Sequence, residues 1–255
     1  MLLTFDTSLA VRYTSASQKV RVLTEDWVER MIFCPNCGQD HLVNYENNRP
    51  VADFYCQNCQ EDFELKSKNG KIGKKIVDGA YEKMIERLQS DSNPNFFLLS
   101  YTPDYYVRNF MIIPKQFFTP SIIERRKPLA DTARRAGWVG CNILLSNIPD
   151  SGKIYLVRDE VVIPRSTVLT KWRKTLFLRE ENKMSVRGWM LDIMRCIERV
   201  GRNDFTLDDM YAFEGELAAV HPENSHIKDK IRQQLQILRD KGYIDFVSRG
   251  HYRLI

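Results

Sequence analysis

Hydrophobic positions in the first two thirds of the chain follow two different periods. Residues 17–32 and 77–88 repeat apolar side chains every three or four positions, which predicts amphipathic helices. Residues 95–101 and 107–113 are short, nearly continuous apolar runs, which predict two central strands buried on both faces of a sheet, and residues 153–157 predict a further strand after a turn at 151–152. Helices interspersed with buried strands predict an α/β core for this part of the chain.

The last third of the chain has a different pattern. Helical periods cover residues 185–200, 207–220 and 225–241, and two short strands at 243–247 and 251–255 flank a turn at 248–250. Ser185 and Thr206 are predicted to cap the first two helices, and Gly242 to end the third. Three helices followed by a hairpin predict a small α+β winged-helix domain.

A polar charge run at residues 179–183 separates these two patterns and predicts a domain boundary. The first domain is therefore expected to span residues 1–182, and the second residues 183–255. A length of 255 residues accommodates two domains, and 43% hydrophobic residues can build a core in each.

Composition limits the classes of protein to consider. The net charge of +5 permits nucleic acid as a partner without requiring it. No apolar run is long enough to span a membrane, and the first residues lack the basic flank and apolar segment of a signal peptide. The sequence thus predicts a cytoplasmic protein with no membrane partner.

Two short strands predicted at residues 51–55 and 62–66 carry the most specific candidate chemistry. If they pair, Asp53 can meet Glu64 across the sheet, and Lys66 projects from the same face as Glu64 because side chains alternate along a strand. Two neighbouring carboxylates bind a hard cation such as Mg²⁺. Lys66 would position or deprotonate a water, or neutralise charge in the transition state. The alternative is a surface hairpin with a Glu/Lys pair.

The predicted helix at 17–32 offers a further carboxylate to this site. Glu25 or Glu29 could reach the metal, although both also fit a solvated helix face.

Four cysteines lie near the candidate catalytic residues in the sequence. Cys34 and Cys37 form one Cys-x2-Cys pair, Cys56 and Cys59 form another, and residues 38–55 separate the pairs. This spacing predicts a tetrathiolate zinc module at residues 34–59, with a structural role because four thiolates leave no open position. Two disulfides are the alternative.

Two basic segments of the first domain are candidates for contact with DNA. Residues 67–75 contain Lys68 and two glycines, and predict a mobile basic loop that either closes over a DNA backbone or is simply solvated. Residues 128–142 contain Arg134, Arg135 and Trp138. Arginines hold phosphates or guanine edges, and a tryptophan offers a stacking or methyl-contacting surface, unless it belongs to the core.

The predicted winged helix has its positive charge where DNA would lie. From Asn224 to the end there are seven Lys and Arg residues against three Asp residues. A winged helix used for protein contact is the alternative. With Trp189 as a second apolar candidate, the expected DNA contacts of this domain are Trp189, Asn224, Ser225, His226, Lys228, Arg232, Arg249 and His251.

The order Asp53, Glu64-x-Lys66 resembles the PD-(D/E)xK nuclease motif. Together with the cysteine module and the winged helix, the chain is similar to the DpnI-like methyl-directed restriction endonucleases. The stretches that carry this resemblance are residues 23–28, 34–38, 46–56, 63–68, 93–97, 132–138, 228–241 and 249–253. Pro50 stands three residues before Asp53 instead of next to it, which departs from the motif without removing a reacting group.

The resemblance implies a restriction-endonuclease-like core with an inserted zinc module. It also implies a type II enzyme that acts as a monomer and cuts both strands of GATC sites containing N6-methyladenine. Both domains would read the methylated site separately. The catalytic Mg²⁺ is expected on Asp53, Glu64 and the main-chain carbonyl of Leu65. A non-cutting reader of methylated DNA, and a nuclease of the same fold with another specificity, remain alternatives.

Overall fold

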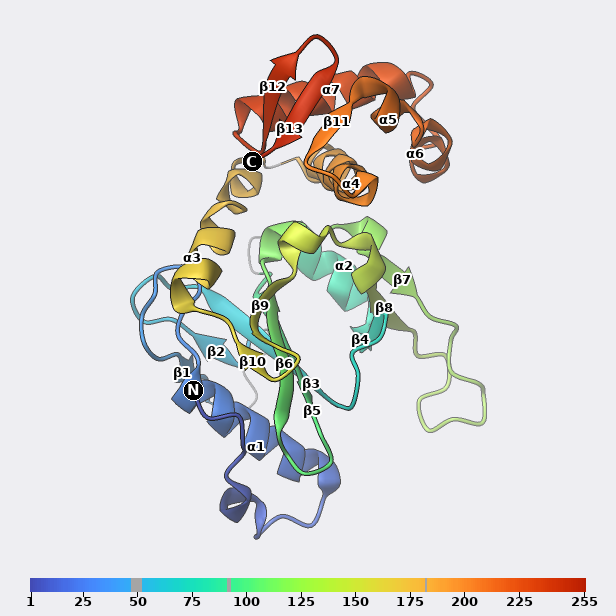
Figure 1. Cartoon of the computed structure of the whole chain (residues 1–255). Coiled ribbons are helices and arrows are strands. Elements are labelled where there is room, and N and C mark those ends of the chain that lie inside the picture. Colours follow the sequence, from blue (N-terminus) through green and yellow to red (C-terminus); the bar gives the residue numbers. More distant parts are fainter. Residues whose placement is uncertain (47–51, 91–92, 182) are drawn as a thin grey trace. The chain divides into compact units, whose positions relative to one another are not determined.

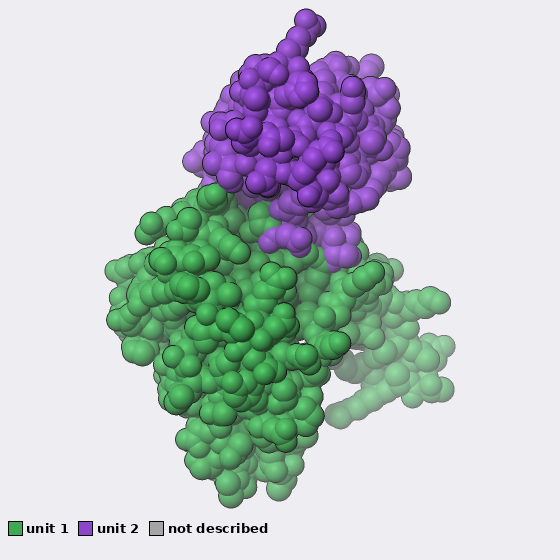
Figure 2. Space-filling model, in the orientation of Figure 1, with its two compact units in different colours: residues 1–145, 151–176 green, residues 146–150, 177–255 purple. Residues whose placement is uncertain are grey.

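A computed structural model describes residues 1–46, 52–90, 93–181 and 183–255. It divides into two compact units, Met1–Leu145 with Ser151–Leu176, and Ser146–Asp150 with Phe177–Ile255 (Figure 2). The predicted boundary falls at Asn182, which lies outside the described residues, so it stays a prediction. Pro50 and Val51 of the candidate motif also lie outside them.

In its described residues the first unit contains a large and a small sheet with three α-helices (Figure 1). Its strands are β1 (Val43–Asn44), β2 (Phe54–Tyr55), β3 (Asp62–Asn69), β4 (Lys75–Ala80), β5 (Asn95–Tyr101), β6 (Val107–Ile113), β7 (Ile123–Arg125), β8 (Gly140–Leu144), β9 (Ile154–Arg158) and β10 (Val161–Val162). Its α-helices are α1 (Ala16–Met31), α2 (Tyr81–Gln89) and α3 (Arg165–Arg173), and its 3-10 turns are Thr7–Ala10, Lys115–Phe117 and Pro120–Ile122. Three further 3-10 turns contain residues of both units: Leu145–Asn147, Asp150–Gly152 and Leu176–Glu180.

The described strands of the large sheet follow the order β1-β2-β3-β5-β6-β9-β10. Strands β3 and β5 are parallel, and the other neighbours are antiparallel. All seven residues of β5 are buried, as its continuous apolar run predicts. The predicted strands at 95–101 and 107–113 are confirmed by β5 and β6.

Apolar side chains on one face of the large sheet pack under α1. Trp27 and Val28 of that helix are fully buried in one cluster with Phe97 and Leu99. Trp27 also donates a hydrogen bond from Nε1 to the carbonyl of Leu2, at 2.8 Å, which satisfies its only donor. The amphipathic helix predicted at 17–32 is thus confirmed, and it covers the sheet beside the candidate motif.

The second, smaller sheet corrects one prediction. Residues 77–88 were expected to form a single helix, but β4 runs to Ala80 and α2 begins at Tyr81. Strand β4 pairs with β8, and β8 pairs with β7, in the order β4-β8-β7. The loop predicted at 67–75 is also wrong at both ends, because β3 extends to Asn69 and β4 begins at Lys75.

The second unit holds four α-helices and a three-stranded sheet in its described residues. They are α4 (Met184–Val200), β11 (Asp204–Thr206), α5 (Leu207–Tyr211), α6 (Glu214–Val220), α7 (Ile227–Asp240), β12 (Ile244–Ser248) and β13 (His251–Leu254). The sheet order is β11-β13-β12, and Ile231, Leu235 and Leu238 of α7 are fully buried. The helical domain with a terminal hairpin is confirmed.

Helix ends in this unit differ in part from expectation. Thr206 caps α5 as predicted, and it forms a capping box with Asp209. Ser185 lies inside α4, whose N-cap is Lys183, so the predicted cap at Ser185 is wrong. The helix expected at 207–220 is two helices, α5 and α6. None of the described helices combines the length and apolar character that crossing a lipid bilayer requires.

Candidate functional site

Asp53 lies beside β3 because the short strand β2 pairs antiparallel with it. Phe54 stands opposite Phe63, and the Asp53 amide donates to the Phe63 carbonyl at 2.9 Å. The Asp53 carboxylate Oδ2 in turn accepts a hydrogen bond from the amide of Leu65 at 2.7 Å. The carboxylate is therefore fixed against the main chain between Glu64 and Lys66.

Glu64 and Lys66 project from one face of β3, as alternation predicts. The ammonium Nζ of Lys66 lies 2.7 Å from Glu64 Oε1 and 2.9 Å from Oδ1 of Asp78, a residue of β4. The other oxygen of Glu64, Oε2, accepts from Nη2 of Arg87 on α2 at 2.9 Å. Two cations and two carboxylates thus form one chain of ion pairs beside Asp53.

The surroundings of Lys66 keep it charged. Desolvation alone lowers the pKa of Lys66, but the charges of Glu64 and Asp78, and its hydrogen bonds to both, raise that pKa above its ordinary value. Lys66 is therefore an ammonium group at neutral pH in this arrangement. Of the roles open to it, neutralising negative charge fits this state better than abstracting a proton.

A cleft of about 680 Å³ connects these residues with α1. Asp53, Glu64, Lys66 and Glu25 all line it. Burial raises the pKa of Glu25, and Asp53 adds to this effect, while the hydrogen bond and charge of Arg21 lower it. Glu29, the other helical candidate, instead accepts a hydrogen bond from Asn44 at 2.6 Å.

The donor atoms around the cleft suit a hard divalent cation. They are the carboxylate oxygens of Asp53 and Glu64. Leu65, whose main-chain carbonyl is the predicted third ligand, lines the same cleft. Both oxygens of Glu64 are engaged by Lys66 and Arg87. A cation on Glu64 would therefore bind a carboxylate that already contacts two positive groups, because each carboxylate oxygen has two acceptor positions.

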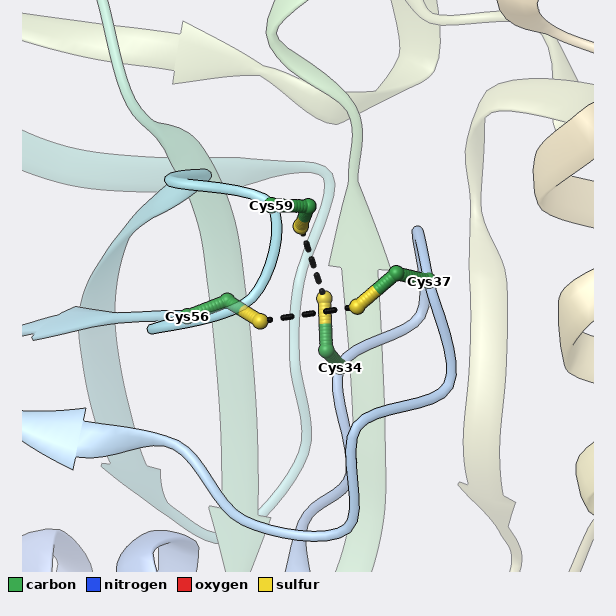
Figure 3. A group of neighbouring side chains, drawn as sticks. All are labelled: Cys34, Cys37, Cys56 and Cys59. Carbon is green, nitrogen blue, oxygen red and sulfur yellow. Dashed lines mark hydrogen bonds between the residues drawn. The ribbon is translucent and has the colours of Figure 1, made fainter.

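The four cysteines of residues 34–59 converge on one point (Figure 3). Their Sγ atoms all lie within 4.8 Å of one another, with Cys34 and Cys59 at 3.5 Å and Cys37 and Cys56 at 3.5 Å. Tetrahedral zinc with Zn–S bonds of about 2.3 Å needs sulfur separations of about 3.8 Å. The cluster can therefore hold zinc, and no disulfide joins these four thiols.

The two Cys-x2-Cys turns have the same backbone design. The amide of Gly38 donates to the Cys34 carbonyl, and the amide of Gln60 donates to the Cys56 carbonyl. Gly38 and Gln60 both have left-handed φ angles, of 82° and 57°. The main chain thus closes each turn in the same way and points its two sulfurs inward.

The cysteines differ in their protonation. Burial raises the pKa of Cys34. Burial also acts on Cys37, but hydrogen bonds from Asn58 and the main chain outweigh it and lower that pKa to about 7. The exposed corner of the cluster is therefore the one that most readily supplies a thiolate, the form that binds metal.

The arginine- and tryptophan-containing loop lies between β7 and β8. Trp138 is half-buried and stands outside the buried core, and the guanidinium of Arg135 lies 4.7 Å from its ring centroid. Arg134 and Arg135 are exposed. Lys68, on β3, is exposed and lines a separate pocket of about 220 Å³ with Lys66. The structure thus presents these basic groups at the surface without bringing all of them together.

The second unit has its own cavity, of about 320 Å³. Trp189 of α4 lines it together with Asn224, Ser225 and His226, so the structure gathers four of the predicted contacts. The Trp189 ring, which is 6% exposed, is also stacked on His221. This combination of an aromatic ring and small polar groups suits a base edge or a methyl group.

The other candidates of the second unit lie outside this cavity. Lys228 and Arg232 are on the exposed face of α7, where Lys228 pairs with Glu214 at 3.3 Å and Arg232 pairs with Asp229. Arg249 and His251 are exposed on the hairpin β12–β13. Exposed cations on a helix and a wing can contact phosphates.

Sequence reasoning missed four residues of these sites. Asp78 and Arg87 were placed on one predicted helix, and only the strand–helix break at Ala80 brings Asp78 to Lys66 and Arg87 to Glu64. His221, which stacks on Trp189, and Gly140, which lies against the Trp138 ring, were not among the predicted contacts. Asp78, Arg87 and His221 carry no local signal, because each contacts a partner distant in the sequence, whereas Gly140 lies two residues after Trp138.

The fold defines an α/β domain with a cleft lined by carboxylates and cations and with a four-cysteine cluster, followed by a helix-turn-helix domain. The chain belongs to the DpnI family, described as the Dam-replacing family, whose model matches residues 1–181. A second model, the Dam-replacing HTH domain, matches residues 185–254. Membership of this family supports a restriction nuclease that binds DNA.

Proposed function

We propose that the protein is a methyl-directed restriction endonuclease that hydrolyses both strands of double-stranded DNA at GATC sites carrying N6-methyladenine. The observation that carries the proposal is the placement of Asp53, Glu64 and Lys66 on one cleft in a chain of the DpnI family. We further propose that the nuclease domain spans residues 1–182 and the winged helix residues 183–255, and that the protein acts as a monomer.

The side chains of the cleft have distinct roles in this proposal. Asp53 and Glu64, with the main-chain carbonyl of Leu65, would hold Mg²⁺. When bound, the cation polarises the scissile phosphate and lowers the pKa of a coordinated water. Lys66 contributes a positive charge where negative charge builds on the phosphate. The Leu65 amide orients the Asp53 carboxylate through its 2.7 Å hydrogen bond.

The four cysteines have a structural role in the proposal. Their cluster joins the turn after α1 to the turn between β2 and β3, so a bound zinc ion holds Asp53 and Glu64 at a fixed distance from α1. Four sulfur ligands leave zinc no open position for a reacting group.

DNA recognition is assigned to both domains. In the first, Trp138 offers an apolar face flanked by Arg134 and Arg135, with Lys68 as a phosphate contact nearer the cleft. In the second, the cavity at Trp189, Asn224, Ser225 and His226 reads the methylated base, while the exposed cations of α7 and the wing hold the backbone. Burying one methyl group contributes on the order of 1 kcal/mol at each surface.

The decisive experiment incubates the protein with Mg²⁺ and two preparations of one plasmid, methylated and unmethylated at adenine of GATC. Cutting of the methylated plasmid alone supports the proposal. Asp53→Asn and Glu64→Gln should abolish cutting while leaving binding in Ca²⁺ intact, since both variants remove a metal ligand and retain the side-chain shape.

Two outcomes favour the alternatives. Methyl-dependent binding without any cutting would identify a non-cutting reader of methylated DNA. Cutting that ignores GATC methylation but follows another modified site would identify a nuclease of different specificity, which a panel of methylated plasmids detects.

A further inference from the structure

Asp78 is a buried carboxylate that contacts the candidate catalytic lysine. Its side chain is 5% exposed, and its Oδ1 lies 2.9 Å from Lys66 Nζ. The same oxygen accepts a hydrogen bond from the amide of Gly79 at 2.8 Å. The other oxygen, Oδ2, is buried and accepts no hydrogen bond from the described residues.

The backbone of β4 is built to present this side chain. Ile76 and Asp78 point to the buried face of β4, while Val77 between them is 64% exposed. The register of β4 on β8 shifts between Asp78 and Ala80, which marks a bulge at Gly79. Asp78 comes before the bulge and keeps the regular alternation of β4, so its charge lies on the same buried face as Ile76.

The Asp78 carboxylate gives Lys66 a second anionic partner, which matters when a cation binds Glu64. In the structure, Lys66 bridges Glu64 and Asp78. A divalent cation held by Glu64 would neutralise this carboxylate and repel the Lys66 ammonium. If Glu64 were the only anionic partner of Lys66, metal binding would leave a partly buried ammonium without a counter-charge.

We propose that Asp78 is the positioning residue for Lys66: it retains the ammonium group when a divalent cation takes Glu64, and so keeps Lys66 beside the reacting phosphate. This inference rests on the proposed nuclease function and its metal site. Asp78 touches neither the cation nor the phosphate, and acts only through Lys66. The free oxygen Oδ2 gives Lys66 a place to move to as it leaves Glu64.

A purely structural ion pair explains these observations less well. A buried pair contributes little net stability, because desolvation of both charges offsets their attraction. Among the described residues, none donates a hydrogen bond to the buried Oδ2 of Asp78. A buried polar atom without a partner is costly and requires an explanation, and accepting a hydrogen bond from Lys66 at another stage supplies one.

The test measures binding of Mn²⁺ to the full-length protein by electron paramagnetic resonance, without DNA. The wild type should bind one Mn²⁺ that Asp53→Asn and Glu64→Gln both abolish. Asp78→Asn should weaken this binding by roughly fivefold or more, because Lys66 then stays on Glu64. In a Lys66→Met background, Asp78→Asn should change the affinity less than twofold, since the residue it acts through is gone.

Glu124→Gln serves as the matched control for charge. Glu124 lies on β7 of the same small sheet and pairs with Lys75, not with Lys66. Removing its charge should leave Mn²⁺ affinity unchanged. An equal loss in Asp78→Asn and Glu124→Gln, or an equal loss with and without Lys66, would overturn the proposal in favour of a general charge effect.

A second measurement needs no substitution at Asp78. A crystal structure of the wild type with Ca²⁺ should show Lys66 Nζ within hydrogen-bond distance of Asp78 and withdrawn from Glu64. Lys66 remaining on Glu64, or leaving both carboxylates, overturns the inference alone. If the wild type binds no cation that depends on Asp53 and Glu64, the proposed function itself fails, which is a separate result.

Discussion

The imidazole ring of His221 lies almost parallel to the indole ring of Trp189, with centroids 3.6 Å apart and planes inclined by 15°. Nε2 of His221 also lies 2.9 Å from Oδ2 of the buried Asp192, so the imidazole is held on both sides. His221, itself held by Asp192, therefore fixes the orientation of the Trp189 ring, which lines the cavity of the second unit.

We expect His221→Ala to reduce the preference for methylated over unmethylated GATC by about two- to tenfold, the range that corresponds to one aromatic pair. Trp189 would lose its backing and its fixed orientation in the cavity. Fluorescence anisotropy with labelled duplexes in Ca²⁺ measures the preference without cutting. His41→Ala, an exposed histidine of the first unit, is the control. If His221→Ala and His41→Ala show the same preference for methylated DNA, His221 does not contribute to recognition of the methyl group.

A second prediction concerns Trp138 and Gly140. A Cβ atom placed on Gly140 would lie 2.7 Å from the Trp138 ring, so any side chain there must move the indole. Gly140→Ala and Trp138→Ala should each lower the preference for methylated DNA by about fivefold, the value of one buried methyl group. Competition between methylated and unmethylated duplexes measures this.

Gly215→Ala is the control for Gly140→Ala. A Cβ on Gly215 meets no atom within 4 Å, and this residue lies on α6, outside the predicted DNA contacts. Its methyl preference should match that of the wild type. A normal preference in Gly140→Ala as well would show that the position of the Trp138 ring does not affect recognition.

The segment 75–89 shows where sequence patterns stop predicting this fold. Apolar side chains at Tyr81, Met84 and Leu88 have helical spacing, and α2 confirms them. The same pattern was extended to Val77 although β4 continues to Ala80. Strand β4 forms because it pairs with β8, about sixty residues later in the chain. The hydrophobic pattern of residues 75–80 alone does not reveal such a long-range pairing.

The residues of the candidate site likewise fall into those that the sequence predicted and those that only the structure revealed. Asp53, Glu64, Lys66 and the cysteines have fixed spacings along the chain, so sequence could propose them together. Asp78 and Arg87 depend on where β4 ends and α2 begins, and therefore became visible only in three dimensions. Residues that position other residues have no required sequence spacing.

The third prediction tests the four-cysteine cluster. Cys59→Ser should abolish stoichiometric zinc and lower the melting temperature of the first unit, because one ligand of the tetrahedron is lost. Atomic absorption gives the zinc content, and differential scanning calorimetry the melting temperature. A chelator should reproduce the effect in the wild type.

Cys196→Ala is the matched control, since Cys196 is a buried thiol of α4 outside the cluster. It should retain zinc at the wild-type stoichiometry. Full zinc content in Cys59→Ser, or equal loss in Cys196→Ala, would contradict the assignment of the metal to the four cysteines.

The last prediction compares two hydroxyl residues at the start of helices in the second unit. The Thr206 hydroxyl accepts a hydrogen bond from the Asp209 amide at 3.1 Å, and Asp209 Oδ2 accepts from the Thr206 amide at 2.7 Å. Thr206→Ala breaks this capping box and should lower the free energy of unfolding by about 1 kcal/mol. Ser185→Ala should change it by less than about 0.5 kcal/mol, because Ser185 lies within α4 and caps nothing. Urea denaturation of both variants measures the difference, and equal losses would mean that the cap at Thr206 does not stabilise α5.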